Sequence, residues 1–252
     1  MKHDSGGLPW SGRELTSTGF DGDVGAADPG LLAALDDPQD ETALMRAMAN
    51  ARLLVPIVVS PGTPAAVDGS GAVGVEQSAE QSTAEKSTDM AVVTLTAPDG
   101  QRAFPVFSSL AALSAWDATA RPSPVTSSRA AQSAVFERCD VMVLDLGSGR
   151  EWVLRPSMVW ALAQRRDWLP AHTDPFVAQA LSRAIAEEAD VEEWAAKEGP
   201  TGSGILRVVL SLRAGLDAAR VQALATRIGE QIATDGEARA RIDGLAFTIG
   251  QA

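Results

Sequence analysis

A short turn between two apolar segments constrains the fold of this chain more than any other feature. Residues 90–96 and 102–107 are largely apolar, and a Pro-Asp-Gly sequence at 98–100 lies between them. These residue types favour a tight turn, and a connection this short can join only antiparallel strands. Residues 191–212 contain a second such pattern around a turn rich in glycine and proline. The hairpins argue against a doubly wound parallel sheet.

Amphipathic helices alternate with these strands. A side-chain oxygen before a helix can accept a hydrogen bond from a free backbone N–H of its first turn, which identifies several helix starts. The expected N-caps are Asp40, Ser108 or Ser109, Thr173 or Asp174, and Asp217. Pro156 predicts a further helix over residues 156–168, because proline suits the first helical turn. Helices mixed with hairpins favour an α+β fold with mixed sheets and packed helices.

Changes in composition divide the chain. Residues 1–27 are rich in Gly, Ser and Asp and are expected to form a flexible N-terminal arm. Residues 28–170 form the first α+β domain, and residues 171–252 a second, smaller α+β subdomain. Within the first, residues 61–87 have few apolar side chains and predict a mobile insertion. The two halves are expected to pack together, and the sequence leaves open whether they share one core.

The net charge of −12 over 252 residues limits the partners of this protein. Such a surface repels nucleic acid and anionic lipid, and the arginines of the middle third are scattered among acidic residues. A membrane span would need about 18 consecutive apolar residues, and no window approaches this. The N-terminus also lacks an apolar segment. We therefore expect a cytoplasmic protein with no membrane partner and regard nucleic acid as an improbable one.

Few residues offer catalytic or metal-binding chemistry. Cys139 is the single cysteine, which excludes an intramolecular disulfide and a cysteine-based zinc site within one chain. The two histidines, His3 and His172, are far apart in the sequence. Gly69–Gly74 matches the pattern G-x-G-x-x-G, but no strand ends directly before it, as a dinucleotide site requires. We expect no metal, no cofactor and no catalytic residues.

A polar segment directly before residues 90–96 is the best local candidate for a binding site. It contains Glu85, Lys86, Ser87 and Asp89. Lys86 is one of only three lysines, and a lysine offers a compact charge that its neighbours can orient toward a ligand. We interpret these residues as a ligand- or partner-binding site. Polar side chains that simply pair with one another at the entrance of a strand are the alternative.

Asp145 is the second candidate. It ends the apolar segment 141–144, and ligand sites often form at the carboxyl ends of strands. A tight Asp-Leu-Gly turn explains this residue equally well.

Several segments of the chain resemble the SseB family, named for enhanced serine sensitivity, in its actinobacterial form. Residues 43–59, 85–125 and 139–154 resemble the N-terminal domain of that family, and residues 168–181 and 204–233 resemble its C-terminal region. The resemblance implies a compact α+β module, and it supports the segment around Lys86, which falls in the family's most recognisable motif. The family has no agreed biochemical activity, so it implies no catalytic residues.

Three functional hypotheses follow. The first is a non-catalytic cytoplasmic binding or regulatory protein that holds a protein partner or a small anionic metabolite. The second is a small-molecule transferase or hydrolase that uses Lys86 with Asp89 or Asp145. The third is a nucleic-acid binder, which the net charge disfavours. The oligomeric state stays open.

Overall fold

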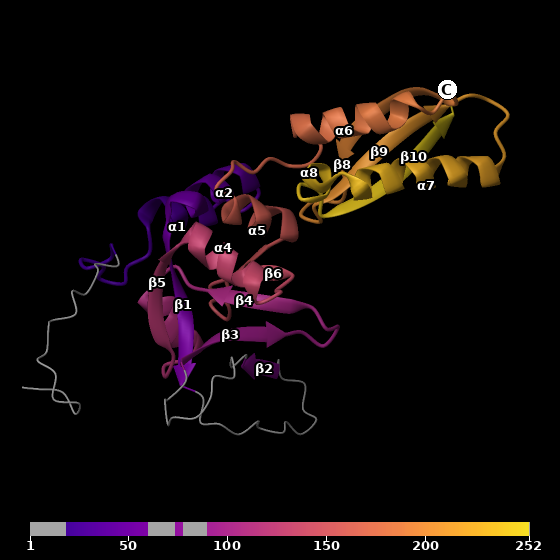
Figure 1. Cartoon of the computed structure of the whole chain (residues 1–252). Coiled ribbons are helices and arrows are strands. Elements are labelled where there is room, and N and C mark those ends of the chain that lie inside the picture. The colour runs from indigo at the N-terminus through magenta and orange to yellow at the C-terminus, as the bar shows by residue number, and fades with distance from the viewer. Residues whose placement is uncertain (1–18, 60–73, 78–89, 252) are drawn as a thin grey trace, which may run out of the picture.

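The computed structural model describes residues 19–59, 74–77 and 90–251, and these residues form two domains (Figure 1). Each domain has its own sheet and its own hydrophobic core. Both sheets are mixed, and helices pack against them, so the predicted α+β fold is confirmed. Residues 164–174 connect the last helix of the N-terminal domain to the first helix of the C-terminal domain.

The N-terminal domain is built on a sheet with the strand order β5-β1-β3-β4-β6-β7, and β2 pairs with β3 beside this path. Its strands are β1 (Arg52–Val59), β2 (Gly74–Gln77), β3 (Met90–Thr96), β4 (Arg102–Val106), β5 (Arg121–Thr126), β6 (Val141–Leu144) and β7 (Trp152–Leu154). The pair β3–β4 is the predicted hairpin and is antiparallel. The pair β4–β6 is parallel, because the chain returns through α3, β5 and α4 before entering β6.

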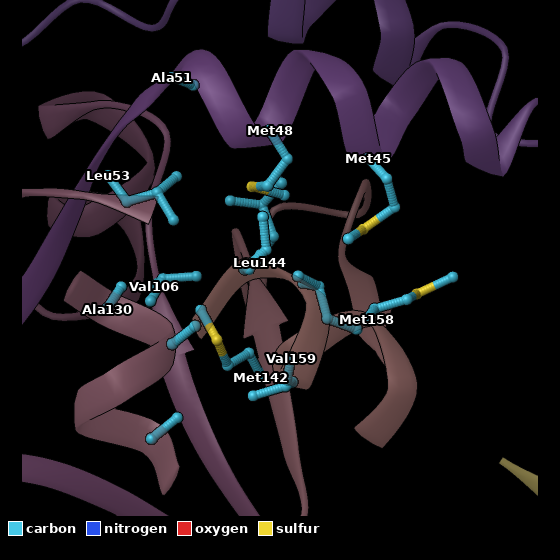
Figure 2. Packing of buried hydrophobic residues seen from close by; sticks show 14 of the residues in the cluster. Met45, Met48, Ala51, Leu53, Val106, Ala130, Met142, Leu144, Met158 and Val159 are labelled. Atoms are coloured by element: carbon cyan, nitrogen blue, oxygen red, sulfur yellow. The ribbon is translucent and has the colours of Figure 1, made fainter. Parts of the chain in front are cut away.

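Helices cover both faces of this sheet. They are α1 (Pro29–Leu35), α2 (Glu41–Asn50), α3 (Leu110–Trp116), α4 (Ser127–Phe136) and α5 (Pro156–Ala163). Figure 2 shows Met45 and Met48 of α2 pointing toward Leu144 of β6, within the main core. Neighbouring residues of β1 alternate between faces, so Leu53 joins this core while Leu54 packs with α3 on the other side.

The C-terminal domain has a sheet of strand order β10-β9-β8. Its elements are α6 (Pro175–Ala186), β8 (Val191–Glu198), β9 (Ile205–Leu212), α7 (Ala218–Thr234), α8 (Gly236–Arg239) and β10 (Gly244–Gln251). Alternate residues of β9, from Leu206 to Leu212, are buried against α6 and α7. Among the described residues, no helix is long and apolar enough to cross a bilayer.

The expected N-caps are confirmed where the structure gives their contacts. Asp40 accepts a hydrogen bond from the backbone N–H of Ala43, and Asp217 accepts one from that of Arg220. Of the paired candidates, Ser109 caps α3 and Asp174 caps α6. Local chemistry is sufficient to identify these positions, because donor and acceptor lie within three residues of each other.

Residues 19–27 differ from the expectation of a flexible arm over residues 1–27. Arg52 holds this segment against the domain, since it forms an ion pair of 2.7 Å with Asp23 and donates to the backbone carbonyls of Ala26 and Ser108. The backbone N–H of Leu110 also donates to the carbonyl of Gly25 at 2.8 Å. The other residues of the expected arm, 1–18, lie outside the described part of the chain.

The predicted helix over residues 156–168 is too long, because α5 ends at Ala163. Arg165 adopts a left-handed conformation with φ of 55°, and the N–H of Arg166 donates to the carbonyl of Ala161. This hydrogen-bond pattern closes the C-terminus of a helix. The chain then turns back and places Trp168 in the core of the N-terminal domain.

Two strands were not expected from the sequence. β5 contains Pro122 and Pro124, which cannot donate backbone hydrogen bonds, and its place at the edge of the sheet makes them tolerable. β2 lies within the expected insertion 61–87 and pairs with β3. The residues of that insertion on either side of β2 lie outside the described ranges.

Candidate binding cleft between the two domains

The candidate site before β3 falls almost wholly outside the described residues. Glu85, Lys86, Ser87 and Asp89 are not among them, and the description of the chain resumes at Met90, where β3 begins. Their role as a ligand- or partner-binding site stays a prediction.

Asp145 is described, and its contacts are structural. Oδ1 accepts a hydrogen bond of 2.7 Å from the backbone N–H of Ser108, and Oδ2 accepts one of 2.6 Å from the Ser108 hydroxyl. Asp145 is only 6 % exposed, and its φ of 51° lies in the left-handed region, which aspartate tolerates better than most residues. The carboxylate therefore ties the end of β6 to the residues that follow β4, and we do not place it in a ligand site.

A cleft of about 590 Å³ lies where the two domains meet. The N-terminal domain contributes residues 38–42 at the start of α2, together with Trp152 and Val153 of β7, Arg155, and Ser157 of α5. The connecting segment contributes Trp168 and residues 170–172. The C-terminal domain contributes the β8–β9 turn, together with Arg241 and Asp243 before β10. This volume suits a small ligand, and binding sites often form between domains.

Arg155 connects the two domains beside this cleft. Its Nη1 and Nη2 atoms donate to the two carboxylate oxygens of Glu41 at 2.6 and 2.8 Å, and its Nε atom donates to Asp243 at 3.0 Å. Its Nη1 atom also donates to the carbonyl of Gly202 at 3.3 Å. Burial alone would lower the pKa of this guanidinium, but Glu41 and Asp243 outweigh that effect and raise it, so Arg155 stays charged.

Asp243 caps α5 from the other domain. Arg155 occupies the N-cap position of α5 and offers no side-chain acceptor to the helix. Asp243 fills this role, because it accepts the backbone N–H of Ser157 at 2.7 Å and the Ser157 hydroxyl at 2.8 Å. A carboxylate is favourable there, since the N-terminus of a helix carries partial positive charge. The helix start and the domain contact therefore share one carboxylate.

Trp168 and Gly204 complete this polar network. The indole N–H of Trp168 donates to the Ser157 hydroxyl oxygen at 2.9 Å, and the Arg155 guanidinium lies 5.8 Å from the centre of the Trp168 ring. Gly204 has a φ of 68°, and a Cβ atom there would collide with the side chains of Arg155 and Asp243. Glycine is needed at this position for both its conformation and its lack of a side chain.

Arg241 is held by a second set of contacts at the cleft. Its Nη1 atom donates to Asp174 at 2.8 Å, its Nε and Nη2 atoms donate to Glu237 at 3.3 Å, and its guanidinium lies 4.2 Å from the centre of the Phe176 ring. Arg166 lies close by, and burial together with the charge of Arg241 lowers the pKa of its guanidinium. Arg166 donates to the carbonyl of Ala240 at 3.1 Å, which holds the connecting segment against the C-terminal domain.

The cleft does not present an assembled set of catalytic groups. Ser157 is only 2 % exposed. Its hydroxyl already donates a hydrogen bond to Asp243 and accepts one from Trp168, so it is not available as a nucleophile. His172 lines the cleft, but among the described residues its ring makes no hydrogen bond or ion pair. No group of three or more potential metal ligands occurs within the ranges that the structure describes. The arrangement is suited to holding a polar molecule.

Cys139 lies apart from the cleft. Burial raises the pKa of its thiol to about 11, and the nearby Arg102 only partly offsets this effect. A thiol with such a pKa is almost fully protonated at neutral pH and is a poor nucleophile.

Sequence reasoning missed the residues that build this network. Glu41, Arg155 and Asp243 are separated by 114 and 88 positions, so no local pattern joins them. One local signal was present: the residue before Pro156 is an arginine, which cannot cap a helix. A helix start without a local cap implies that a hydrogen-bond acceptor from a distant residue binds its free N–H groups, but the sequence does not identify that residue.

The fold and the cleft define a two-domain α+β protein whose domains meet around a buried polar network. The family model described as SseB protein N-terminal domain matches residues 30–161. The chain belongs to the SseB family. The matched residues run from α1 into α5, so they correspond to the N-terminal domain. No curated protein and no solved structure matches the chain.

Proposed function

We propose that this member of the SseB family is a non-catalytic binding protein that takes a small ligand in the cleft between its domains. The observation that carries the proposal is the cleft of about 590 Å³ lined by residues from both domains. A ligand that contacts both walls of the cleft would stabilise one arrangement of the two domains, since a ligand favours the conformation that it binds more tightly. Such a protein could report the level of its ligand to a protein partner.

Binding is favoured over catalysis by the state of the polar groups. The Ser157 hydroxyl is hydrogen-bonded to Asp243. The hypothesis of an enzyme would use Asp145, but this carboxylate is hydrogen-bonded to Ser108. A nucleophile needs a neighbouring base within hydrogen-bond reach, and the described cleft residues show no such pair around His172.

The cytoplasm is the compartment that we propose. The single cysteine supports it, because proteins of oxidising compartments often depend on disulfides, which this chain cannot form internally.

Co-purification of small molecules tests the proposed function. Thr201→Trp would fill the cleft from the exposed β8–β9 turn, where Thr201 lines it. Thr248→Trp is the matched control, because Thr248 is exposed on β10 and does not line the cleft. We expect native mass spectrometry to find a small molecule with the wild type and the control variant, but not with Thr201→Trp.

Two outcomes would contradict the proposal. Thr201→Trp could retain the same small molecule as the wild type, which would place the binding site elsewhere. Alternatively, catalytic turnover of the retained molecule would show that the protein is an enzyme.

A further inference from the structure

The charges that line the cleft are unequal. Four carboxylates face it, from Asp40, Glu41, Glu198 and Asp243, against two guanidinium groups, from Arg155 and Arg241. An excess of one charge in a cleft raises the local concentration of ions of the opposite sign. The lining therefore favours a cation.

Both arginines are already paired with carboxylates. Arg155 directs its donors to Glu41, Asp243 and the carbonyl of Gly202. Arg241 directs its Nε, Nη1 and Nη2 atoms to Glu237 and Asp174. An anionic ligand that displaced Glu41, Asp243 or Asp174 from these arginines would leave a largely buried carboxylate without its partner, which is costly. The lining therefore favours a cation over the small anionic metabolite that the sequence led us to expect.

Two of the carboxylates keep free capacity. Glu198 is exposed at the end of β8, and among the described residues its carboxylate makes no hydrogen bond or ion pair. Asp40 uses Oδ1 to cap α2, and no described residue occupies its Oδ2 atom. Glu198 belongs to the C-terminal domain and Asp40 to the N-terminal domain. A cation in the cleft can therefore be attracted by both domains.

Apolar surface lies beside these carboxylates. Trp152 is half-buried, and Val153, Pro170 and Ile205 also line the cleft. An indole ring attracts a cation above its face, and the aliphatic groups can pack against a hydrocarbon stem.

From these observations we infer that the ligand of the cleft is a small organic cation, an ammonium or guanidinium group on a short apolar stem. The inference rests on the proposed function and specifies the chemistry of its ligand. Glu198, Asp40 and the Trp152 ring would receive the positive group, and the aliphatic side chains would receive the stem.

A matched set of three probes tests this chemistry. Butylguanidinium carries the cation, butylurea has nearly the same shape without charge, and pentanoate carries a negative charge on a similar stem. Each would be titrated into the full-length protein labelled with ¹⁵N, and the amide signals of the cleft residues Thr201, Gly202 and Gly204 would be followed. We expect saturable shifts with butylguanidinium that weaken as salt is added, and affinity at least about tenfold lower for the other two probes.

Charge-removing variants connect the result to the two carboxylates. Asp40→Asn with Glu198→Gln removes both charges, and asparagine preserves the helix cap because it is as good an N-cap as aspartate. The matched control is Asp217→Asn with Glu193→Gln, which changes another helix cap and another exposed residue of β8, both outside the cleft. We expect the first variant to bind butylguanidinium about tenfold more weakly and the control to bind it normally.

The outcomes separate this inference from the proposed function. If butylurea or pentanoate shifts the cleft signals as strongly as butylguanidinium, the cleft binds small molecules but does not select cations, and only the inference fails. Equal affinity in the first variant and the wild type would also overturn it. If no probe shifts these signals, the inference fails, and the co-purification experiment then decides the proposed function independently.

Discussion

Asp145 and Asp243 bind a serine in the same way at two different places in the molecule. In each case one carboxylate oxygen accepts the backbone N–H of the serine, at 2.7 Å, and the other oxygen accepts its hydroxyl, at 2.6 Å for Ser108 and 2.8 Å for Ser157. Asp145 does this inside the N-terminal domain, while Asp243 does it across the junction of the two domains.

The difference between the two carboxylates lies in what surrounds them. Asp145 has Ser108 as its side-chain partner, and it joins the ends of two neighbouring parallel strands. Asp243 also accepts a hydrogen bond of 3.0 Å from Arg155, and the indole N–H of Trp168 donates to Ser157, the serine that Asp243 binds. The same local chemistry thus fixes the end of a strand at Asp145 and joins the two domains at Asp243. The following variants test whether this distinction holds.

The largest effect is expected from Asp145→Ala. The change leaves the N–H and hydroxyl of Ser108 without their acceptors in a buried site, and it places alanine in a left-handed conformation. Together these effects should lower the free energy of unfolding by about 3–4 kcal/mol. Urea denaturation followed by circular dichroism would measure the loss.

Asp145→Asn provides the control for this prediction. Asparagine tolerates the left-handed conformation and can still accept one hydrogen bond, so its loss should be about half as large. A loss below about 1 kcal/mol for Asp145→Ala would show that the pair with Ser108 does not stabilise the domain as we describe.

An intermediate effect, of a different kind, is expected from Asp243→Ala. The change removes the external cap of α5 and an acceptor of Arg155, and it should weaken the attachment of the domains by about 2 kcal/mol. Both hydrophobic cores would keep their residues. We therefore expect faster proteolysis in the connecting residues 164–174 and a larger radius of gyration in X-ray scattering, with folded domains.

Arg155→Lys gives a graded version of the same test. Lysine keeps the charge but cannot bind Glu41 through two parallel hydrogen bonds, so proteolysis should rise less than in Asp243→Ala. Unchanged proteolysis of residues 164–174 in Asp243→Ala would mean that other contacts hold the domains together.

The smallest effect is expected at a third carboxylate cap, Asp235, whose side chain is 28 % exposed and pairs with the exposed Arg183. The backbone N–H of Ala238 lowers the pKa of Asp235, and Arg183 contributes to the same shift. Its contribution to stability is therefore complete above the ordinary pKa of about 4 and is lost as the pH falls through the lower pKa of the folded state. Solvent screening limits that contribution to less than about 0.5 kcal/mol.

Asp235→Asn should remove this part of the acid sensitivity, because asparagine can still cap α8 but does not titrate. Urea denaturation at several values between pH 6 and pH 3, for the wild type and the variant, would measure the difference. Equal losses of stability in both proteins on acidification would contradict the assignment to Asp235.

The sequence alone determined the elements whose causes are local. The caps at Asp40 and Asp217 were predictable because each donor lies three residues from its acceptor. The hairpin of β3 and β4 was predictable because its turn admits only antiparallel pairing. These local rules were sufficient for the α+β class.

Only the tertiary structure decided how the distant parts meet. The edge position of β5 makes its prolines acceptable, and the left-handed turn at Arg165 ends α5 early and lets Trp168 join the core. Asp145 was a candidate from its place at a strand end, but its partner Ser108 is 37 residues away. Asp243 caps a helix that begins 87 residues before it, from another domain. Such contacts depend on how whole elements pack, and packing brings together residues that no pattern in the sequence relates.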